Sequence, residues 1–389
     1  MNNYSRVYAE VNIDIIRNNI SKIKSELKNS KFMAVIKADG YGHGAVSCAK
    51  YINDIVDFYG VATVDEALDL KSSFINKPIL ILGAIFDEKI PDALSSDIRF
   101  TVFDINTAKR LSEYAKVMNK NCYIHIKIDT GMNRIGFKND ECLIDKIKTI
   151  YNLPNIVIEG IFTHFANADE DDLLRANNQL SDFKKILDKL SDNKINIPIK
   201  HCANSAAILN FDNAHMDMVR AGLITYGYYP SNYVDKKIKV EPALSLKSHV
   251  IFVKYIEKNQ GISYNSSFIS DKRMKIATIP VGYGDGYPRS LSNIGYVLIN
   301  GHKANIVGKI CMDQFMVDVS DIEDVNINDE VILIGSDGKN NITLDELSNL
   351  SNKFNYEFIC GLSKRIPRLY YRNGEVIDEI NYFYTNRRI

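Results

Sequence analysis

The sequence predicts an α/β protein, an amino-terminal (β/α)8 barrel followed by a mostly β carboxy-terminal domain. Up to about residue 225, eight short β-branched runs alternate with amphipathic helical patterns, whereas after about residue 240 strand follows strand. The 389 residues are enough for two domains, one of them a complete barrel. The stretch YYPSNYVDKKIKVEP is polar and flanked by prolines. We therefore expect domains over 1–240 and 241–389.

The eight predicted strands share a short length and a high content of Val, Ile and Phe. They are FMAVIK (32–37), FYGVAT (58–63), PILILG (78–83), RFTVFD (99–104), CYIHIKID (122–129), IVIEGIFTHF (156–165), IPIKHCAN (197–204) and HMDMVRAG (215–222). Alternation of strands and helices with short links implies a parallel sheet. An open doubly wound sheet is the competing topology, but eight βα units favour a closed barrel.

Helical patterns are clearest in VDEALDLKSSF and INTAKRLSEYAKVMN, where apolar residues recur every three or four positions. Asp65 and Asn106 stand near these helix starts, as capping would favour. In the second domain only TLDELSNLSNK has a helical pattern, and Thr343 is its candidate N-cap.

Composition narrows the class of partner. Lys plus Arg and Asp plus Glu both total 48, so no net charge attracts nucleic acid or an anionic membrane. A small molecule is the expected partner. The start, MNNYSRVYAEVNIDI, lacks the features of a signal peptide, and no segment is apolar enough to span a membrane, so we expect a cytoplasmic protein. The six cysteines form no CxxC pair, which predicts reduced, mostly buried thiols.

Polar side chains gather where the predicted strands end, at the mouth that holds the active site of a barrel. These residues are Lys37, Lys127, Asp129, Arg134, His164, Asn204, Ser205, Arg220 and Gly222. Each has a simpler interpretation: Lys37 could be solvated or ion-paired, His164 a satisfied core histidine, and Arg220 the partner of Asp217 or Asp285. Their convergence at one mouth favours a site. The lack of clustered carboxylates argues against a metal.

The ligand that suits this mouth carries a phosphate. Gly222 and the amides after it, Ser205 and the Tyr41 hydroxyl form a possible donor cluster for phosphate. Lys37 could form a Schiff base. A phosphate, an aldehyde and a lysine together indicate pyridoxal 5'-phosphate, an electron sink for negative charge at the Cα of an amino acid.

Nine stretches then identify a family resemblance. They are AVIKADGYGHGA, KIDTGMNRIGF, GIFTHFANAD, HCANSAA, VRAGLITYG, GISYNSSF, PVGYGDGYPR, GKICMDQFMVDV and YEFICGLSKRIPR. In this order they resemble the alanine racemases, pyridoxal-phosphate enzymes of fold type III, across nearly the whole chain. The departures are GMN in place of the frequent GMG, and CGLSKR, where a bulkier residue often follows the cysteine.

The resemblance implies a two-base racemase. Lys37 would hold the cofactor and act as one catalytic base, and Tyr264 would be the other, because inversion needs proton removal on one face and delivery on the opposite face. A free tyrosine has a pKa of about 10, so its neighbours must help it act as a base. The family pattern implies a hydrogen-bonded chain from Tyr264 through His164 to Arg220. Arg220 would face the pyridine nitrogen and leave it unprotonated.

The resemblance also assigns the remaining site residues. Those that would hold the phosphate are Tyr41, Ser205, Gly222, Leu223 and Tyr356, with Asn204 beside them. Arg134 and the amide of Met312 would bind the substrate carboxylate. Lys127 matches a lysine that is carbamylated in many members and that then orients the arginine matching Arg134.

The resemblance further implies a head-to-tail homodimer, since Tyr264 and Met312 lie in the second domain and must reach a barrel mouth. The first ten or so residues would pack with that second domain. The expected reaction is the interconversion of L-alanine and D-alanine, with D-alanine supplied for peptidoglycan.

Four other interpretations compete. A racemase of serine or another small amino acid would use the same two bases. A pyridoxal-phosphate carrier protein has a similar barrel and lysine but lacks the second domain that carries SYNSSF and CMDQ. A fold-type III decarboxylase has different motifs and benefits from a protonated cofactor ring, which Arg220 disfavours. A barrel without an active site conflicts with so many converging strand ends.

Overall fold

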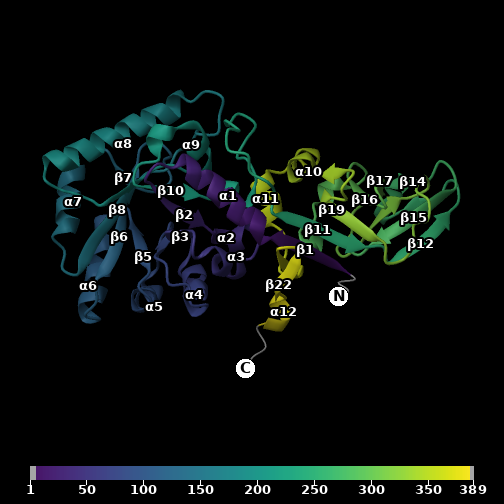
Figure 1. The fold of residues 1–389 in the computed structure, drawn as a ribbon, viewed down its shortest axis with the longest axis horizontal. Helices are drawn as coiled ribbons and strands as arrows, with labels where there is room; N and C mark the ends of the chain where they lie inside the picture. Colours follow the sequence, from purple (N-terminus) through teal and green to yellow (C-terminus); the bar gives the residue numbers. More distant parts are fainter. Residues whose placement is uncertain (1–5, 386–389) are drawn as a thin grey trace. The chain divides into compact units, whose positions relative to one another are not determined.

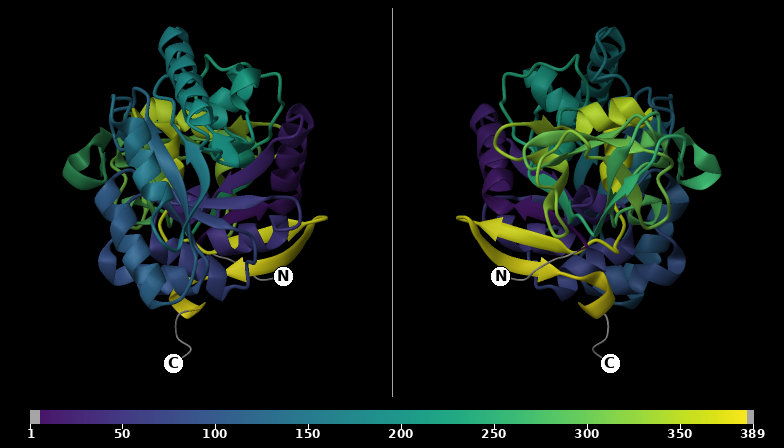
Figure 2. Two further views of the ribbon diagram at one scale, coloured as in Figure 1. Left: turned by 90° about the vertical axis from the view of Figure 1, so that its left-hand side faces the viewer. Right: turned by 90° about the vertical axis from the view of Figure 1, so that its right-hand side faces the viewer.

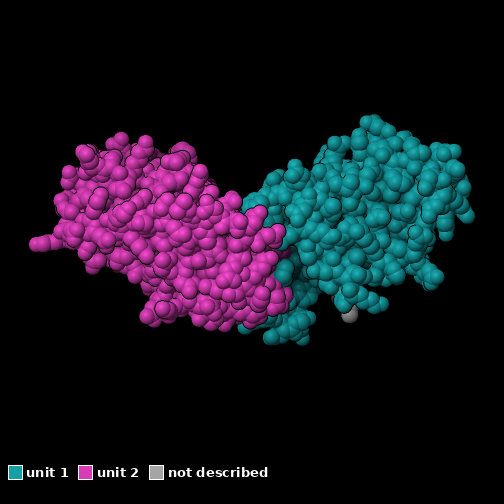
Figure 3. Space-filling model, turned by 90° about the horizontal axis from the view of Figure 1, so that it is seen from above, with its two compact units in different colours: residues 1–14, 41–44, 242–389 teal, residues 15–40, 45–241 magenta. Residues whose placement is uncertain are grey.

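A computed structural model describes residues 6–385 of the chain (Figure 1). It contains two compact units, coloured separately in Figure 3. The barrel unit consists of residues 15–40 and 45–241, and the β unit consists of residues 1–14, 41–44 and 242–389. No helix within residues 6–385 is both long enough and apolar enough to cross a bilayer.

The barrel unit is built on a parallel sheet in the order β10-β2-β3-β4-β5-β6-β8-β9. These strands are β2 (Lys31–Val35), β3 (Phe58–Val61), β4 (Ile79–Ile81), β5 (Arg99–Val102), β6 (Cys122–Asp129), β8 (Ile156–Phe162), β9 (Ile199–His201) and β10 (Met218–Ala221). The edge strands β9 and β10 approach each other, because the Asp217 amide donates to Lys200 O (3.1 Å) and the Arg220 amide to Ala203 O (3.0 Å). The predicted eight-stranded α/β barrel is confirmed, and it is nearly closed.

Helices cover the outside of this sheet, as Figures 1 and 2 show. They are α1 (Ile13–Glu26), α3 (Ala45–Ile52), α4 (Val64–Ser72), α5 (Ile90–Ser95), α6 (Ile105–Val117), α7 (Leu143–Tyr151), α8 (Leu174–Asp192) and α9 (Ser205–Asn210). A short strand not expected from the sequence, β7 (Phe137–Lys138), pairs with the end of β6.

The caps of α4 and α6 lie two residues before the expected positions. Thr63 caps α4 and forms a capping box with Glu66, and Asp104 caps α6 by accepting from the Thr107 amide. A cap must accept from an amide two or three residues further on. Asp65 and Asn106 already lie within the first turns.

The β unit is built on an eleven-stranded sheet in which β1 (Val7–Asn12) lies between β11 and β21. Its other strands are β11 (Leu244–His249), β12 (Phe252–Ile256), β15 (Met274–Ile279), β16 (Tyr296–Ile299), β17 (His302–Val307), β18 (Phe315–Asp318), β19 (Glu330–Ser336), β20 (Asn341–Ile342), β21 (Arg368–Arg372) and β22 (Glu375–Ile380). A separate hairpin joins β13 (Gly261–Ile262) to β14 (Phe268–Ile269). The mostly β second domain is confirmed. Residues 1–5 lie outside the described part of the chain.

The helices of the β unit are α10 (Leu344–Ser351), α11 (Asn355–Cys360) and α12 (Tyr382–Thr385). Thr343 caps α10 as predicted, because its hydroxyl accepts from the Glu346 amide (3.1 Å). The sequence did not indicate α11 or α12, because helices of six and four residues are too short to show a helical period.

The six cysteines are free thiols, but only half are buried. Cys48, Cys122 and Cys202 lie in the core, whereas Cys142 is exposed and two others are partly exposed. The expectation that they are mostly buried was therefore wrong for three of the six.

Candidate active site

Lys37 lies on a left-handed turn rather than on a strand. Strand β2 ends at Val35, and Lys37 opens the short segment α2 (Lys37–Tyr41), in which φ is 51° at Ala38 and 54° at Asp39. Side chains with a Cβ avoid this region, so the turn is strained and depends on its surroundings. The expected strand over 32–37 is therefore two residues too long.

Two carboxylates hold this turn in place. Glu66 accepts from the Ala38 amide (2.7 Å) while its other oxygen accepts from the Ala62 amide (2.7 Å). Asp39 accepts from the Ala45 amide (2.9 Å) at the start of α3. These bonds fix the backbone on both sides of the strained residues and so fix the origin of the Lys37 side chain.

Arg220 is a buried cation on β10 with a relative exposure of 3%. Its guanidinium donates to Thr163 O (2.8 Å), Cys202 O (3.0 Å), His164 Nδ1 (3.1 Å) and His201 Nδ1 (2.9 Å). All four acceptors are uncharged. The Nε–H of Arg220 makes no hydrogen bond to any residue in the described range, so this donor remains for a ligand atom.

The simpler pairings considered for Arg220 do not occur. Asp217 instead pairs with Lys200 (3.6 Å), and Asp285 pairs with Arg6 (2.7 Å). Arg220 is therefore held by neutral acceptors, which leave its positive charge available at the mouth of the barrel.

His164 follows β8 and carries its proton at a defined atom. Because a guanidinium can only donate, the Nδ1 of His164 accepts from Arg220, and the ring proton lies on Nε2. Burial and the positive charge of Arg220 hold the pKa of His164 well below its usual value. The ring is therefore a neutral Nε2–H donor.

Lys127 lies inside the barrel on β6, with a relative exposure of 3%. Its ammonium donates to Ile128 O (2.7 Å) and lies 5.6 Å from the ring centroid of Phe162. Burial and the charge of Arg220 lower the pKa of Lys127 to about 8. Most of this amine is still protonated near physiological pH, but the neutral fraction is much larger than for a free lysine.

Arg134 lies on the loop that follows β6 and is exposed. The loop begins with a turn in which Asp129 accepts from the amides of Gly131 and Asn133 (3.0 Å each). After burial and the charge of Arg220, the positive charge of Arg134 also contributes to the lowered pKa of Lys127.

Four of the expected phosphate-binding residues gather between α9 and the short helix η3 (Leu223–Tyr226). Asn204 caps α9, and Ser205 is the first residue of that helix. The Gly222 amide donates to the Ser205 hydroxyl (3.1 Å), which brings the starts of the two helices together.

The other two expected phosphate ligands lie in the β unit. The ring centroids of Tyr41 and Tyr356 are 6.1 Å apart, and Tyr356 also stacks on Phe354 at 4.6 Å. The two tyrosines that the family resemblance assigns to one group are therefore neighbours.

Tyr264 projects from the surface of the β unit with a relative exposure of 64%. It lies in a tight turn whose neighbours Ser263 (φ 66°) and Asn265 (φ 59°) are left-handed. The Ser263 hydroxyl donates to Lys309 O (2.7 Å), which ties this turn to the segment leading to Met312.

Met312 lies on the same surface and is 52% exposed. Its carbonyl accepts from the Gly284 amide (2.9 Å), while the Tyr283 amide donates to Cys311 O (3.1 Å). A hollow of about 220 Å³ is lined by Tyr264, Tyr283, Arg289 and Ile310. Tyr264 and the Met312 segment thus form one exposed surface.

Sequence reasoning missed Glu66 and the interior residues His125, Glu159 and His201. One signal was present in CYIHIKID, where His125 and Lys127 are two residues apart and so face the same side of a strand. The sequence gives no comparable indication that His125 contacts Glu159 and His201, which are distant from it in the sequence.

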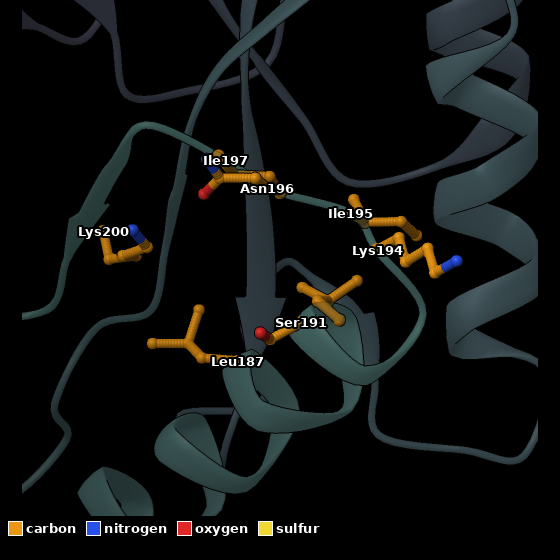
Figure 4. A pocket seen from close by; sticks show the side chains of 8 residues that line it. Leu187, Ser191, Lys194, Ile195, Asn196, Ile197 and Lys200 are labelled. Carbon is orange, nitrogen blue, oxygen red and sulfur yellow. The ribbon is translucent and has the colours of Figure 1, made fainter.

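A pocket elsewhere on the barrel unit has no comparable chemistry. It has a volume of about 220 Å³ and lies between the end of α8 and the segment leading to β9. Figure 4 shows Leu187 and Ser191 across from Asn196 and Ile197. This pocket lies around the start of β9 and includes Lys200, whereas the barrel residues described above follow the strands or lie near their carboxyl ends.

Comparisons with known proteins agree with this geometry. The chain matches the family models "Alanine racemase, N-terminal domain" over residues 11–230 and "Alanine racemase, C-terminal domain" over residues 243–370. It is 41% identical over 378 residues to an alanine racemase from Clostridium perfringens, covering 97% of this chain and 98% of that protein. It is 44% identical over 379 residues to one from Clostridium tetani, with the same coverage of each.

Solved structures give the same result. An alanine racemase from Clostridium difficile 630 superposes with a TM-score of 0.93 at 40% identity, covering 97% of this chain and 98% of that one. One from Bacillus anthracis with bound L-Ala-P has a TM-score of 0.92 at 35% identity, covering 98% of each chain. The resemblance carried by the nine stretches is confirmed, and the chain belongs to the alanine racemase family, whose members are isomerases.

Proposed function

We propose that this enzyme interconverts L-alanine and D-alanine with pyridoxal 5'-phosphate and two bases, Lys37 and Tyr264. The observation that carries the proposal is the state of Arg220. This buried guanidinium has only neutral acceptors, and its Nε–H has no acceptor among residues 6–385. A pyridine nitrogen with a free lone pair is an acceptor that fits this donor.

The donors and charges of the barrel mouth also fit the cofactor. Lys37 would bind the aldehyde carbon, and the groups of the barrel unit that would hold the phosphate are those of Asn204, Ser205, Gly222 and Leu223. The family resemblance adds Tyr41 and Tyr356, which lie in the β unit. When bound, the cofactor withdraws electrons from the Cα of the amino acid. Arg220 leaves the pyridine nitrogen unprotonated, which weakens this withdrawal and disfavours side reactions.

His164 supports the tyrosine base. Its Nδ1 accepts from Arg220 (3.1 Å), so its Nε2–H is available to a phenolate oxygen. A hydrogen bond to the charged form lowers the pKa of a tyrosine. We propose that Tyr264 receives this bond and exchanges the α-proton on one face of the substrate, while the amine of Lys37 exchanges it on the other.

The substrate carboxylate would lie between Arg134 and the amide of Met312. Lys127, once carbamylated, would become an anion that orients Arg134. The exposed surface of the β unit that carries Tyr264 and Met312 supports a head-to-tail homodimer, in which the β domain of one subunit, 241–389, completes the barrel domain of the other, 1–240. The cytoplasmic location and the role of D-alanine in peptidoglycan synthesis stay predictions.

Purified protein incubated with L-alanine and pyridoxal 5'-phosphate tests the proposal directly. Chiral chromatography should show D-alanine accumulating until the two enantiomers are equal, and Lys37→Ala should form none. Formation of D-serine from L-serine without D-alanine would move the assignment to serine. Bound cofactor without racemisation of either amino acid would contradict an enzymatic role.

A further inference from the structure

A continuous chain of side chains runs through the interior of the barrel unit and ends at Arg220. Arg220 Nη1 lies 2.9 Å from His201 Nδ1, and His201 Nε2 lies 2.8 Å from His125 Nδ1. His125 Nε2 lies 3.2 Å from a Glu159 oxygen, and Glu159 pairs with Arg99 at 3.2 Å. Both imidazoles are fully buried. Arg99 is the first residue of β5, so the chain extends from the strand starts towards the mouth.

A local irregularity of the sheet makes room for this chain. Ile124 pairs with Ile158 but His125 pairs with Gly160, so Glu159 is an extra residue in a β-bulge of β8. A Cβ on Gly160 would lie 2.3 Å from His125 Nδ1. The bulge and the glycine together allow the imidazole to lie against β8 with the carboxylate within reach.

The donor and acceptor roles along the chain are determined from its two ends. Arg220 only donates, so His201 Nδ1 must accept and its proton lies on Nε2. That proton points at His125 Nδ1, which must accept, so the proton of His125 lies on Nε2 and is donated to Glu159. Neither ring can be a cation in this arrangement.

The surroundings of the rings favour the neutral state. Burial and the charge of Arg220 hold the pKa of His201 well below its usual value, and burial lowers the pKa of His125. Phe162 stacks on the His201 ring at 4.8 Å. The charged groups that act on the two rings are Arg220, Lys127, Glu159 and Arg99.

We propose that Glu159, His125 and His201 are positioning residues that fix the orientation of Arg220 by imposing one direction on this hydrogen-bonded chain. A carboxylate can only accept and a guanidinium can only donate, so Glu159 and Arg220 set the same direction from opposite ends, and both histidines present Nδ1 as an acceptor. In the reverse direction His201 would carry Nδ1–H, which cannot bind the guanidinium. The consequence for the cofactor rests on the proposed function, in which Arg220 donates to the pyridine nitrogen.

The first test is the protonation of the two rings in the wild-type holoenzyme. The protein has seven histidines, so the 15N spectra of histidine-labelled protein are simple. The variants His125→Asn and His201→Asn assign the signals of the two rings. We expect both rings to be neutral with the proton on Nε2 from about pH 6 to 9. A proton on Nδ1, or a charged ring in this range, would overturn the proposal.

The second test uses Glu159→Gln, whose carboxamide can also donate to His125 and so permits the reverse direction. The readout is pyruvate, formed when the amino group of alanine moves to the cofactor, whose aldehyde carbon is reduced as Cα is oxidised. We expect the ratio of pyruvate formed to alanine racemised to rise about tenfold, as Arg220 loses its fixed partner. Arg220→Glu is the positive control.

The matched negative control is Asp54→Asn, which breaks a bidentate pair with Arg17 (2.6 and 2.8 Å) on the surface of the same unit. It should leave the ratio and the histidine spectra unchanged. If the Glu159→Gln variant had the same histidine spectra and the same pyruvate ratio as the wild type, the positioning role would be refuted. Absence of D-alanine formation by the wild type would contradict the proposed function instead. The wild-type spectra decide the tautomers even if Glu159→Gln fails to fold.

Discussion

A tyrosine acts as a base at neutral pH only when a neighbouring donor stabilises its phenolate. His164 offers such a donor, because Arg220 occupies its other nitrogen. In the proposed two-base mechanism, Tyr264→Phe removes the base on one face of the substrate and leaves Lys37 on the other. We expect exchange of the α-proton of L-alanine with deuterated water to fall far more than exchange from D-alanine. Mass spectrometry of each enantiomer measures both rates.

His164→Gln tests the neighbouring donor separately, because it keeps the tyrosine and removes the imidazole ring. With His164→Gln, exchange from L-alanine should fall while its optimum moves to higher pH, because the phenolate forms less readily. Equal losses from both enantiomers in Tyr264→Phe would contradict the two-base assignment.

Lys127, to which the proposed function gives a role in orienting Arg134, opposes stability as a buried cation. Its pKa in the folded protein is about 8, below the 10.5 of a free lysine, so burial of its charge costs free energy below pH 8. At a pH between these two values, Lys127 is neutral in the folded protein and protonated in the unfolded chain, so unfolding takes up a proton. The free energy of unfolding therefore rises with pH from about 8 to 10.5.

Lys127→Met removes that cost and keeps the volume of the side chain. In buffer depleted of carbon dioxide at pH 7, the variant should be more stable by about 3 kcal/mol, with the difference disappearing towards pH 10.5. Urea unfolding of both proteins at each pH measures this. A variant that is less stable than the parent at pH 7 would show that the ammonium is well solvated or paired.

At the scale of elements, the sequence predicted the strands well because each buried strand of a parallel sheet is a short apolar run between helices. It misplaced the end of β2, because Ala38 and Asp39 adopt a left-handed conformation that their side chains do not favour. Glu66 stabilises the turn by accepting from the Ala38 amide, and Asp39 stabilises it by accepting from the Ala45 amide. Such a conformation depends on distant partners, so local sequence preferences do not predict it.

Glu66 links helix α4 to this turn. Two variants can therefore distinguish its role in capping α4 from its role in positioning the Lys37 turn. Thr63→Ala removes only the cap and should lower the free energy of unfolding by about 1 kcal/mol. Glu66→Ala also releases the Ala38 amide and should cost about 2 kcal/mol. Only Glu66→Ala should weaken retention of the cofactor during dialysis, followed by absorbance. Equal cofactor loss in both variants would contradict the positioning role of Glu66.

The sequence did not predict the hydrogen-bonded chain of Glu159, His125 and His201 for a related reason. Strand alternation places His125 and Lys127 on one face, but nothing local indicates that a bulge brings Glu159 beside His125. Arg220 was singled out because it lies near the end of an apolar strand within a family motif, whereas its partner His201 lies inside a predicted strand and its contact with Arg220 leaves no local pattern. Residues at strand ends were thus predictable, and contacts across the barrel interior were not.

At the scale of the whole molecule, the site residues are divided between two compact units. Lys37, His164 and Arg220 belong to the barrel unit, whereas Tyr264 and Met312 lie on an exposed surface of the β unit. Met312 is 52% exposed on that surface, and in the proposed head-to-tail dimer a second subunit would bury it.

A mixture of two inactive variants tests this arrangement. Lys37→Ala spoils the barrel site and Tyr264→Phe spoils the contribution of the β unit, so each homodimer should be inactive in the formation of D-alanine from L-alanine. In a head-to-tail hybrid, one site carries both substitutions and the other carries neither. After unfolding and refolding an equal mixture, half the dimers are hybrids with one intact site each, so activity should return to about a quarter of the wild-type value. If Lys37 and Tyr264 of the same subunit formed each site, no intact site could arise and the mixture would stay inactive.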